Sequence, residues 1–475
     1  QLGSAQDQNA WSEGNQWTIN SFFSRVNYTF ANKYVIEGTI RADGSSRFDP
    51  DHRWGWFPGV NAAWRVGEEG FMKRLGWFED LKVRASYGEM GNQSGIGLYD
   101  YIQLISLSND YYPVGTGVKG QMATSGNIIS TSRTWETIQT TNVGFDFSTL
   151  NNRLYGSFDY FWKENKNMLI PKTYPSMLGA DAPSTNSGHL SIHGWEISLG
   201  WRDQIKDFSY SVRFNISDAK NKVVDRVGSN LIQLGNNETP TGYPLNSYFG
   251  YEFDGIIQNE QELEAYKSRF SEGGIPGDLS VGDAMYKDLD GDGKLSVLGD
   301  GKEGSGDVKY LGDKNPRYNF GFNLSMAWKG FDLSAFIQGV GRRTMFLEGE
   351  SRCPMPEAWY QSAEYWYGKT WTPERTDAQY PAITLKDKRN YNYYVSTNTK
   401  FNVAYARLKN LQFGYTIPQT LTSKAGLQKV RVYFSGEDLF EVHNTPNGWD
   451  PEENSGSITS YPFTRNYSFG INVVF

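Results

Sequence analysis

Three aspartates alternate with other residues in a glycine-rich segment in the second half of the chain. Asp288, Asp290 and Asp292 occupy positions one, three and five of this segment, Gly293 occupies position six, and Lys294 follows at position seven. Calcium needs several hard oxygen ligands that converge on a tight turn, and the start of an EF-hand loop has this spacing. The segment therefore predicts a calcium site.

The rest of this segment departs from the EF-hand pattern. Position twelve is Gly299, whereas an EF-hand has a bidentate glutamate there. That ligand would have to come from Asp300, Glu303 or Asp307, and we include Asp300 in the predicted set. The alternative interpretation is an acidic turn that is only solvated. We expect a bound ion to stiffen a long loop, and we expect no cofactor for activity itself.

Aromatic residues gather in two other segments of the chain. Sugar rings can stack on the flat faces of such side chains, while polar neighbours bond to hydroxyl groups. The predicted substrate-binding residues are Tyr111, Tyr112, Trp359, Tyr365, Trp366 and Tyr367. The alternative is that these aromatics pack loops against each other or against a partner. Trp371, beside Pro373, fits a structural turn better.

Catalytic chemistry finds little support in the sequence. His189 and His193 would stand about 13 Å apart in a strand, too far for one metal ion. The serine elbow and the phosphate-binding loop are both missing as motifs. Cys353 is the one cysteine, so no disulfide can form within this sequence, and no activating pattern surrounds it. The sequence therefore does not predict an enzyme.

Apolar and polar residues alternate with a period of two along many segments. In 316–328, aromatic and aliphatic residues alternate with small or polar ones, and 207–218 and 464–475 do the same. Lipid outside and a polar lumen inside would produce this pattern in a transmembrane β-barrel. Thirteen segments qualify, most of them long enough to cross a bilayer as a tilted strand: 17–30, 33–42, 54–66, 81–90, 136–148, 152–164, 187–202, 207–218, 316–328, 330–340, 403–416, 428–438 and 464–475.

The connections between these segments alternate between short and long. Long ones include 91–135, 165–186, 219–315 and 341–402, and 245–253 is assigned to one of them although it is strand-like. Outer-membrane barrels have short periplasmic turns and long extracellular loops, so the C-terminus is expected in the periplasm. Thirteen strands is an odd number, whereas bacterial single-chain barrels have even numbers. We therefore expect that this chain does not close a barrel alone.

The composition agrees with this all-β, membrane-spanning fold class. Aromatic residues make up 15% of the chain and glycine is abundant, at 51 residues. No run of 18 apolar residues is present, which argues against a transmembrane helix and leaves the closed barrel as the way to span a membrane. The net charge of -7 argues against a nucleic-acid partner. The polar start has no apolar signal region, so either a signal was removed or the chain begins within a longer protein.

Several long segments resemble the SusC/RagA family of TonB-dependent transporters, in the same order along the chain. They are SFFSRVNYTFANKYVIEGTIRADGSSRFDPDHRWGWFPGVNAAWRVGEEGFM, WFEDLKVRASYGEMGNQ, NPRYNFGFNLSMAWKGFDLSAFIQGVG, YWYGKTWTPERTDAQYPAI, YARLKNLQFGYTIP, VRVYFSGEDLF and YPFTRNYSFGINVVF. The family has a plugged barrel of about 22 strands. The resemblance therefore implies that residues 1–475 form the C-terminal part of such a barrel, and that the plug domain and about nine earlier strands lie outside this chain.

The same resemblance implies a function and a set of partners. It implies import of oligosaccharides across the bacterial outer membrane, energised by TonB–ExbB–ExbD, together with a SusD-like surface lipoprotein and the upstream half of the transporter. Outer-membrane lipids would surround the barrel. The alternatives are a peptide importer of the same fold, a passive porin and a soluble β-rich binding protein. A metal chelate is a further alternative cargo, which the implied lipoprotein partner disfavours.

Overall fold

The computed structural model describes most of the chain. The described residues are 14–103, 105–108, 113–114, 118–119, 122–125, 128–171, 183–226, 234–235, 239–299, 306–356, 361–384, 387–453, 456–457, 461 and 463–475. Among them, no helix combines the length and the apolar character needed to cross a membrane.

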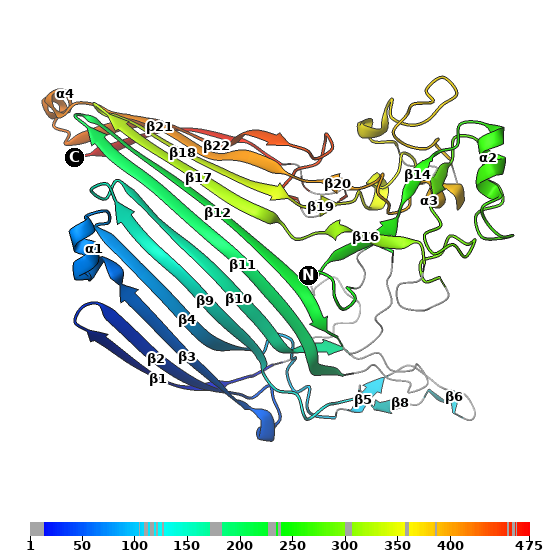
Figure 1. The fold of residues 1–475 in the computed structure, drawn as a ribbon, viewed down its shortest axis with the longest axis horizontal. Helices are drawn as coiled ribbons and strands as arrows, with labels where there is room; N and C mark the ends of the chain where they lie inside the picture. The colour runs from blue at the N-terminus through cyan, green and yellow to red at the C-terminus, as the bar shows by residue number, and fades with distance from the viewer. Residues whose placement is uncertain are drawn as a thin grey trace.

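One antiparallel sheet of thirteen strands forms the body of the molecule, and it curves into a wall (Figure 1). Each strand pairs with the strands before and after it among the thirteen, so β1 and β23 form the two edges. The thirteen predicted strands are thereby confirmed. They are β1 (Ile19–Phe30), β2 (Tyr34–Ser45), β3 (Trp54–Arg65), β4 (Asp80–Asn92), β9 (Glu136–Thr149), β10 (Leu154–Pro171), β11 (Ser184–Ile205), β12 (Phe208–Asp225), β17 (Arg317–Trp328), β18 (Phe331–Arg342), β21 (Tyr405–Thr416), β22 (Lys429–His443) and β23 (Asn466–Val474).

Tight turns connect the strands at one end of this wall. Ala31 and Asn32 adopt left-handed backbone conformations between β1 and β2, and Lys329 and Gly330 do so between β17 and β18. Positive φ angles at both turn residues match the twist of the flanking strands. The helices α1 (Gly70–Leu75) and α4 (Gln419–Thr422) lie at the same end (Figure 1).

The two faces of the wall differ in polarity, as the period of two requires. Phe30, Tyr34, Trp64, Val83 and Phe145 stand opposite one another in successive strands and therefore share one face. Each of them is at least 39% exposed. Such a continuous apolar surface on a soluble protein would cause aggregation, whereas lipid tails cover it in a membrane.

The opposite, inner face carries charged and amide side chains. Arg84 donates to Asp159 at 2.6 Å and also contacts Asp146, which pairs with Lys82 at 2.7 Å. Glu37 accepts hydrogen bonds from neighbouring strands on the same face. These residues come from different strands, so the inner face is lined by a polar network that a water-filled or plugged lumen can accommodate.

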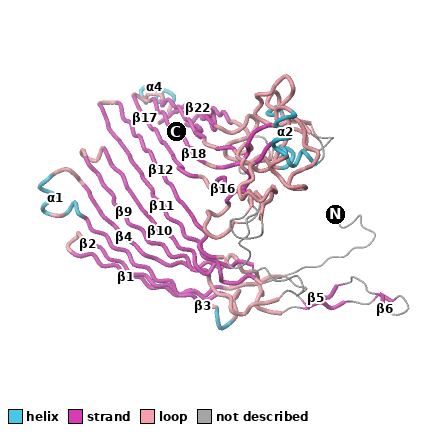
Figure 2. Tube along the Cα trace, turned by 45° about the vertical axis from the view of Figure 1, so that its right-hand side comes forward, coloured by secondary structure: helices cyan, strands magenta, loops and turns pink. Residues whose placement is uncertain are grey.

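A second folded body stands at the other end of the wall, where the long connections lie (Figure 2). We call it the loop unit: the described parts of residues 239–316 and 343–404. Three buried clusters, rich in aromatic residues, hold it together. Backbone hydrogen bonds join its Gly242 and Tyr243 to Val223 of β12. Its elements are β13 (Ser247–Tyr251), β14 (Phe253–Ile256), α2 (Glu260–Lys267), β15 (Ala284–Tyr286), β16 (Val308–Asp313), β19 (Thr344–Met345), α3 (Asp387–Asn392) and β20 (Phe401–Asn402).

Some predicted strand boundaries were wrong at this end. The predicted loops 165–186 and 219–315 begin too early, because β10 continues to Pro171 and β12 continues to Asp225; β11 likewise starts at Ser184. Beyond the membrane both faces of a strand can be polar, so the alternation that marks a strand fades. The strand-like stretch 245–253 contains β13, which pairs with β16 in a separate small sheet, as its assignment to a loop requires. The predicted loop 91–135 also contains short strands: β5 (Ile105–Ser108), β6 (Pro113–Val114), β7 (Val118–Lys119) and β8 (Met122–Ser125).

Candidate functional site at the long-loop end

Two long loops interlock through a buried polar contact. Asn392, in the second loop, is 2% exposed and donates to the Asp283 carboxylate of the first loop at 2.9 Å. Its side-chain oxygen accepts from the Ala284 backbone N–H at 2.9 Å. Asp283 is fully buried and also accepts from Ser280. A buried carboxylate is costly unless it is hydrogen-bonded, so this contact specifies how the loops fit together.

Three tyrosines extend the same contact. The hydroxyl groups of Tyr266 and Tyr391 lie 2.9 Å apart, and the Tyr286 hydroxyl donates to the Tyr391 carbonyl at 2.9 Å. Burial raises the pKa of each of these phenols. The hydroxyls therefore stay protonated and keep donating hydrogen bonds at physiological pH.

The acidic turn lies on the first long loop. Carboxylate oxygens of Asp288, Asp290 and Asp307 lie within 4.8 Å of one another, the one such group among the described residues. Backbone N–H groups orient these side chains: Asp288 accepts from Gly293 at 2.9 Å, and Asp290 accepts from Gly306 at 2.7 Å. Three hard oxygen donors on a tight turn fit the preference of calcium.

Asp307 completes this group although it lies 17 residues after Asp290 and 19 after Asp288 in the sequence. It is fully buried and accepts from Leu289 at 2.6 Å and from Ser296 at 2.7 Å. Burial raises the pKa of Asp307, the two hydrogen bonds oppose that rise, and the negative charges of Asp290 and Asp288 add to it. A cation at this position would relieve the repulsion among the three carboxylates.

The structure brings only some of the predicted metal ligands together. Asp288 and Asp290 come together, and Asp307, considered as one of three candidates for the missing ligand, joins them. Asp292 instead accepts from the Lys294 backbone N–H at 2.7 Å and is not in the group. Asp300 and Glu303 lie outside the described residues.

The predicted substrate-binding aromatic residues differ in whether their rings are accessible. Trp366 is 3% exposed inside a core of the loop unit, and Tyr365 packs beside it with its hydroxyl 2.6 Å from that of Tyr380. Both rings are occupied by packing. Tyr367 is 90% exposed and its ring is accessible. Tyr111, Tyr112 and Trp359 lie outside the described residues.

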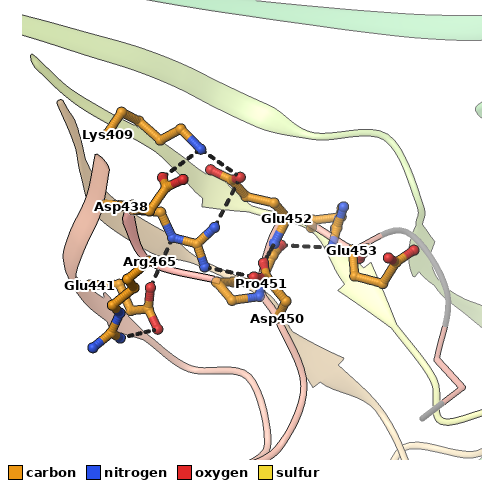
Figure 3. Close-up of polar contacts among 10 residues, drawn as sticks. Lys409, Asp438, Glu441, Asp450, Pro451, Glu452, Glu453 and Arg465 are labelled. Carbon is orange, nitrogen blue, oxygen red and sulfur yellow. Dashed lines mark hydrogen bonds and ion pairs between the residues drawn. The ribbon is translucent and has the colours of Figure 1, made fainter. Parts of the chain in front are cut away.

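A buried arginine at the mouth of the wall was not predicted. Arg407, on β21, has no exposed side-chain surface and pairs with Glu441, Asp450 and Glu452 at 2.9 to 3.0 Å. Lys409 also pairs with Glu452, and Arg465 pairs with Glu441 (Figure 3). These contacts fix the segment after β22 onto the wall. The only sequence signal was the acidic run 450–453, which gives no indication of its partner.

Comparisons with known proteins identify the family. The family described as TonB dependent receptor-like, beta-barrel, matches residues 2–439. TonB-dependent receptor P3 of Formosa agariphila is 32% identical over 97% of this chain and 46% of that protein. TonB-dependent receptor SusC of Bacteroides thetaiotaomicron is 26% identical over 99% of this chain and 45% of that protein. The chain thus spans about half the length of these relatives.

A solved structure has the same fold. The RagAB peptide transporter superposes with a TM-score of 0.77 at 23% identity, over 96% of this chain and 48% of that one. The curved wall, its apolar outer face and the match to the family all point the same way. The chain belongs to the TonB-dependent receptor-like β-barrel family of the bacterial outer membrane, and SusC is among its relatives.

Proposed function

We propose that the protein to which this chain belongs imports oligosaccharides across the outer membrane with energy from TonB–ExbB–ExbD. A SusD-like surface lipoprotein is the proposed partner at the extracellular, long-loop end. The upstream part of the barrel and a plug complete the transporter, and the short turns face the periplasm. A lumen of this width needs a plug, and the outer membrane holds no useful ion gradient, so uphill uptake requires energy from elsewhere.

The cargo assignment depends on one observation about the inner wall. Uncharged hydroxyl and amide side chains occupy the same height on six successive strands and stand opposite one another. They are Ser211, Ser325, Ser334, Gln412, Ser435 and Ser468. Such a row offers hydrogen bonds to a hydroxyl-rich, uncharged molecule without the selective attraction that a charged peptide would need. Ser211, Ser325 and Ser334 also line a cavity of about 710 Å³ on this face, whose other lining residues include the charged Arg153, Arg202, Asp203 and Asp332.

Uptake measurements test this proposal directly. Cells with the full-length protein are expected to accumulate a pool of neutral fluorescent oligosaccharides, and deletion of tonB is expected to abolish the accumulation. A pool of short labelled peptides serves as the parallel probe, because the RagAB structure is that of a peptide transporter. Preferential uptake of the peptides would show that the cargo is a peptide and not an oligosaccharide. Uptake that survives without TonB would indicate a passive pore.

We also propose a structural calcium ion at Asp288, Asp290 and Asp307. Calcium is expected to protect the loop unit against limited proteolysis, and Asp307→Asn is expected to remove this protection because it deletes the buried carboxylate. Asp292→Asn is the matched control, since Asp292 lies outside the group. Protons compete for Asp307, whose pKa is raised, so the protection should weaken as the pH falls through that pKa. Equal protection in both variants would contradict the assignment.

A further inference from the structure

The outer face of the wall changes from apolar to polar across three successive rows of side chains. On strands β4, β9, β10 and β11, one row consists of Ala85, Val143, Tyr160 and Trp195. Four residues further along each strand, toward the long-loop end, the same face carries only polar groups. This polar row, extended to β12, is Glu89, Gln139, Glu164, Ser191 and Lys222.

The row between these two marks the boundary of the hydrocarbon. It consists of Tyr87, Thr141, Trp162, His193 and Lys220, which stand opposite one another from β4 to β12. Tyrosine and tryptophan favour the membrane interface because they have an apolar body and a polar edge. Side chains in the polar row therefore lie at the level of the lipid headgroups.

Basic residues concentrate in one part of this boundary and just beyond it, toward the long-loop end. Lys166, His193, Lys220 and Lys222 are all exposed on β10, β11 and β12. His193 and Lys220 stand directly opposite each other, and Lys222 is two residues further along the same face. We call these four residues the basic patch.

Three carboxylates lie near the basic patch, and two of them contact other groups. Glu164 accepts from His189 at 2.6 Å and from Ser191 at 2.7 Å. Asp218, one row below the patch, forms a buried pair with Arg317. Asp225 lies at the end of β12, beyond Lys222. Three lysines thus face two carboxylates, Glu164 and Asp225, that no arginine neutralises, which leaves the patch with a small net positive charge.

We propose that the basic patch binds the phosphate groups of an outer-membrane lipid headgroup. A phosphate between Lys220 and Lys222 would receive two ammonium groups, with the His193 ring as a further donor on the neighbouring strand. The inference rests on the membrane placement in the proposed function, but not on the cargo. Tyr160, one row below the patch, and Trp162, in the row of His193 and Lys220, would contact the first part of the acyl chains.

Lipid binding to the purified full-length transporter tests this proposal. Micelles doped with phosphorylated fluorescent lipid A are the probe, and the double variant Lys220→Gln, Lys222→Gln is compared with the unaltered protein. Each lysine near an anionic surface contributes about fivefold to binding, so the double variant should bind about 25-fold more weakly. Binding to the unaltered protein should also weaken as the salt concentration rises.

A matched control variant, a dephosphorylated lipid and a competing anion complete the test. Lys206→Gln, Lys329→Gln removes the same charge at the turn end of the wall and should leave binding unchanged. Dephosphorylated lipid A should bind like the double variant. Equal binding by all proteins, or equal binding of both lipids, would overturn the proposal. If millimolar inorganic phosphate competes with the lipid, the ligand of the patch would be a free anion and not a lipid headgroup. Uptake of oligosaccharide is measured separately, so a failure of the lipid assay leaves the import proposal intact.

Discussion

Arg407→Met is expected to release the segment after β22 from the wall. The substitution removes the cation shared by Glu441, Asp450 and Glu452 and leaves these partly buried carboxylates facing each other. Breaking such a pair costs about 3 kcal/mol, the low end of the usual range because the carboxylates retain some exposure. Hydrogen exchange of residues 444–453 should then accelerate about 100-fold.

Two further variants separate this role from a general effect of charge. Arg465→Gln removes a pairing partner of Glu441 whose side chain is 44% exposed, and it should change exchange only slightly. Arg407→Lys should resemble Arg407→Met, because an ammonium group cannot reproduce the planar fork that reaches three carboxylates. Unchanged exchange in Arg407→Met would mean that the segment is held by other contacts.

Asn392→Ala is expected to loosen both long loops together. The change deletes the donor to Asp283 and the acceptor for the Ala284 N–H, and both groups are buried. Removing one partner from such a contact costs about 2–4 kcal/mol. Proteolytic cleavage should therefore increase in residues 254–286 as well as around Asn392 itself.

Asn398 provides the control in the same loop. Its side chain donates to the Gln379 carbonyl at 3.1 Å from a more exposed position, so Asn398→Ala should have little effect. The informative comparison is between the two loops. If Asn392→Ala increases cleavage only in its own loop, the two loops are stable independently. The contact between Asn392 and Asp283 would then not hold the loop unit together.

The wall was predictable because its signal is local. A period of two over ten or more residues identifies a strand, and the lengths of the connections indicate which strands are neighbours. The predicted strands were too short mainly at the long-loop end. Around Lys166 both faces of β10 turn polar, so this strand extends beyond its predicted limit.

The candidate site was harder to predict because its contacts join distant residues. The spacing of Asp288 and Asp290 is visible in the sequence, but Asp307 could only be considered as one of several candidates. Asn392 and Asp283 are 109 positions apart, and neither residue stands out in its own segment. Trp366 looked like a sugar-stacking residue, whereas its apolar ring fills a core. An aromatic residue in a loop has the same sequence signature in both roles.

The interlocking of the two long loops has a consequence for chimeric transporters. Surface loops are usually exchanged one at a time between homologues, on the assumption that each is an autonomous insertion. Here, grafting one loop from a relative would pair a foreign sequence with the resident Asp283 or Asn392, and the buried groups would lose their matching partners. We therefore expect the two loops to evolve together. In a chimeric transporter they need to be transplanted together.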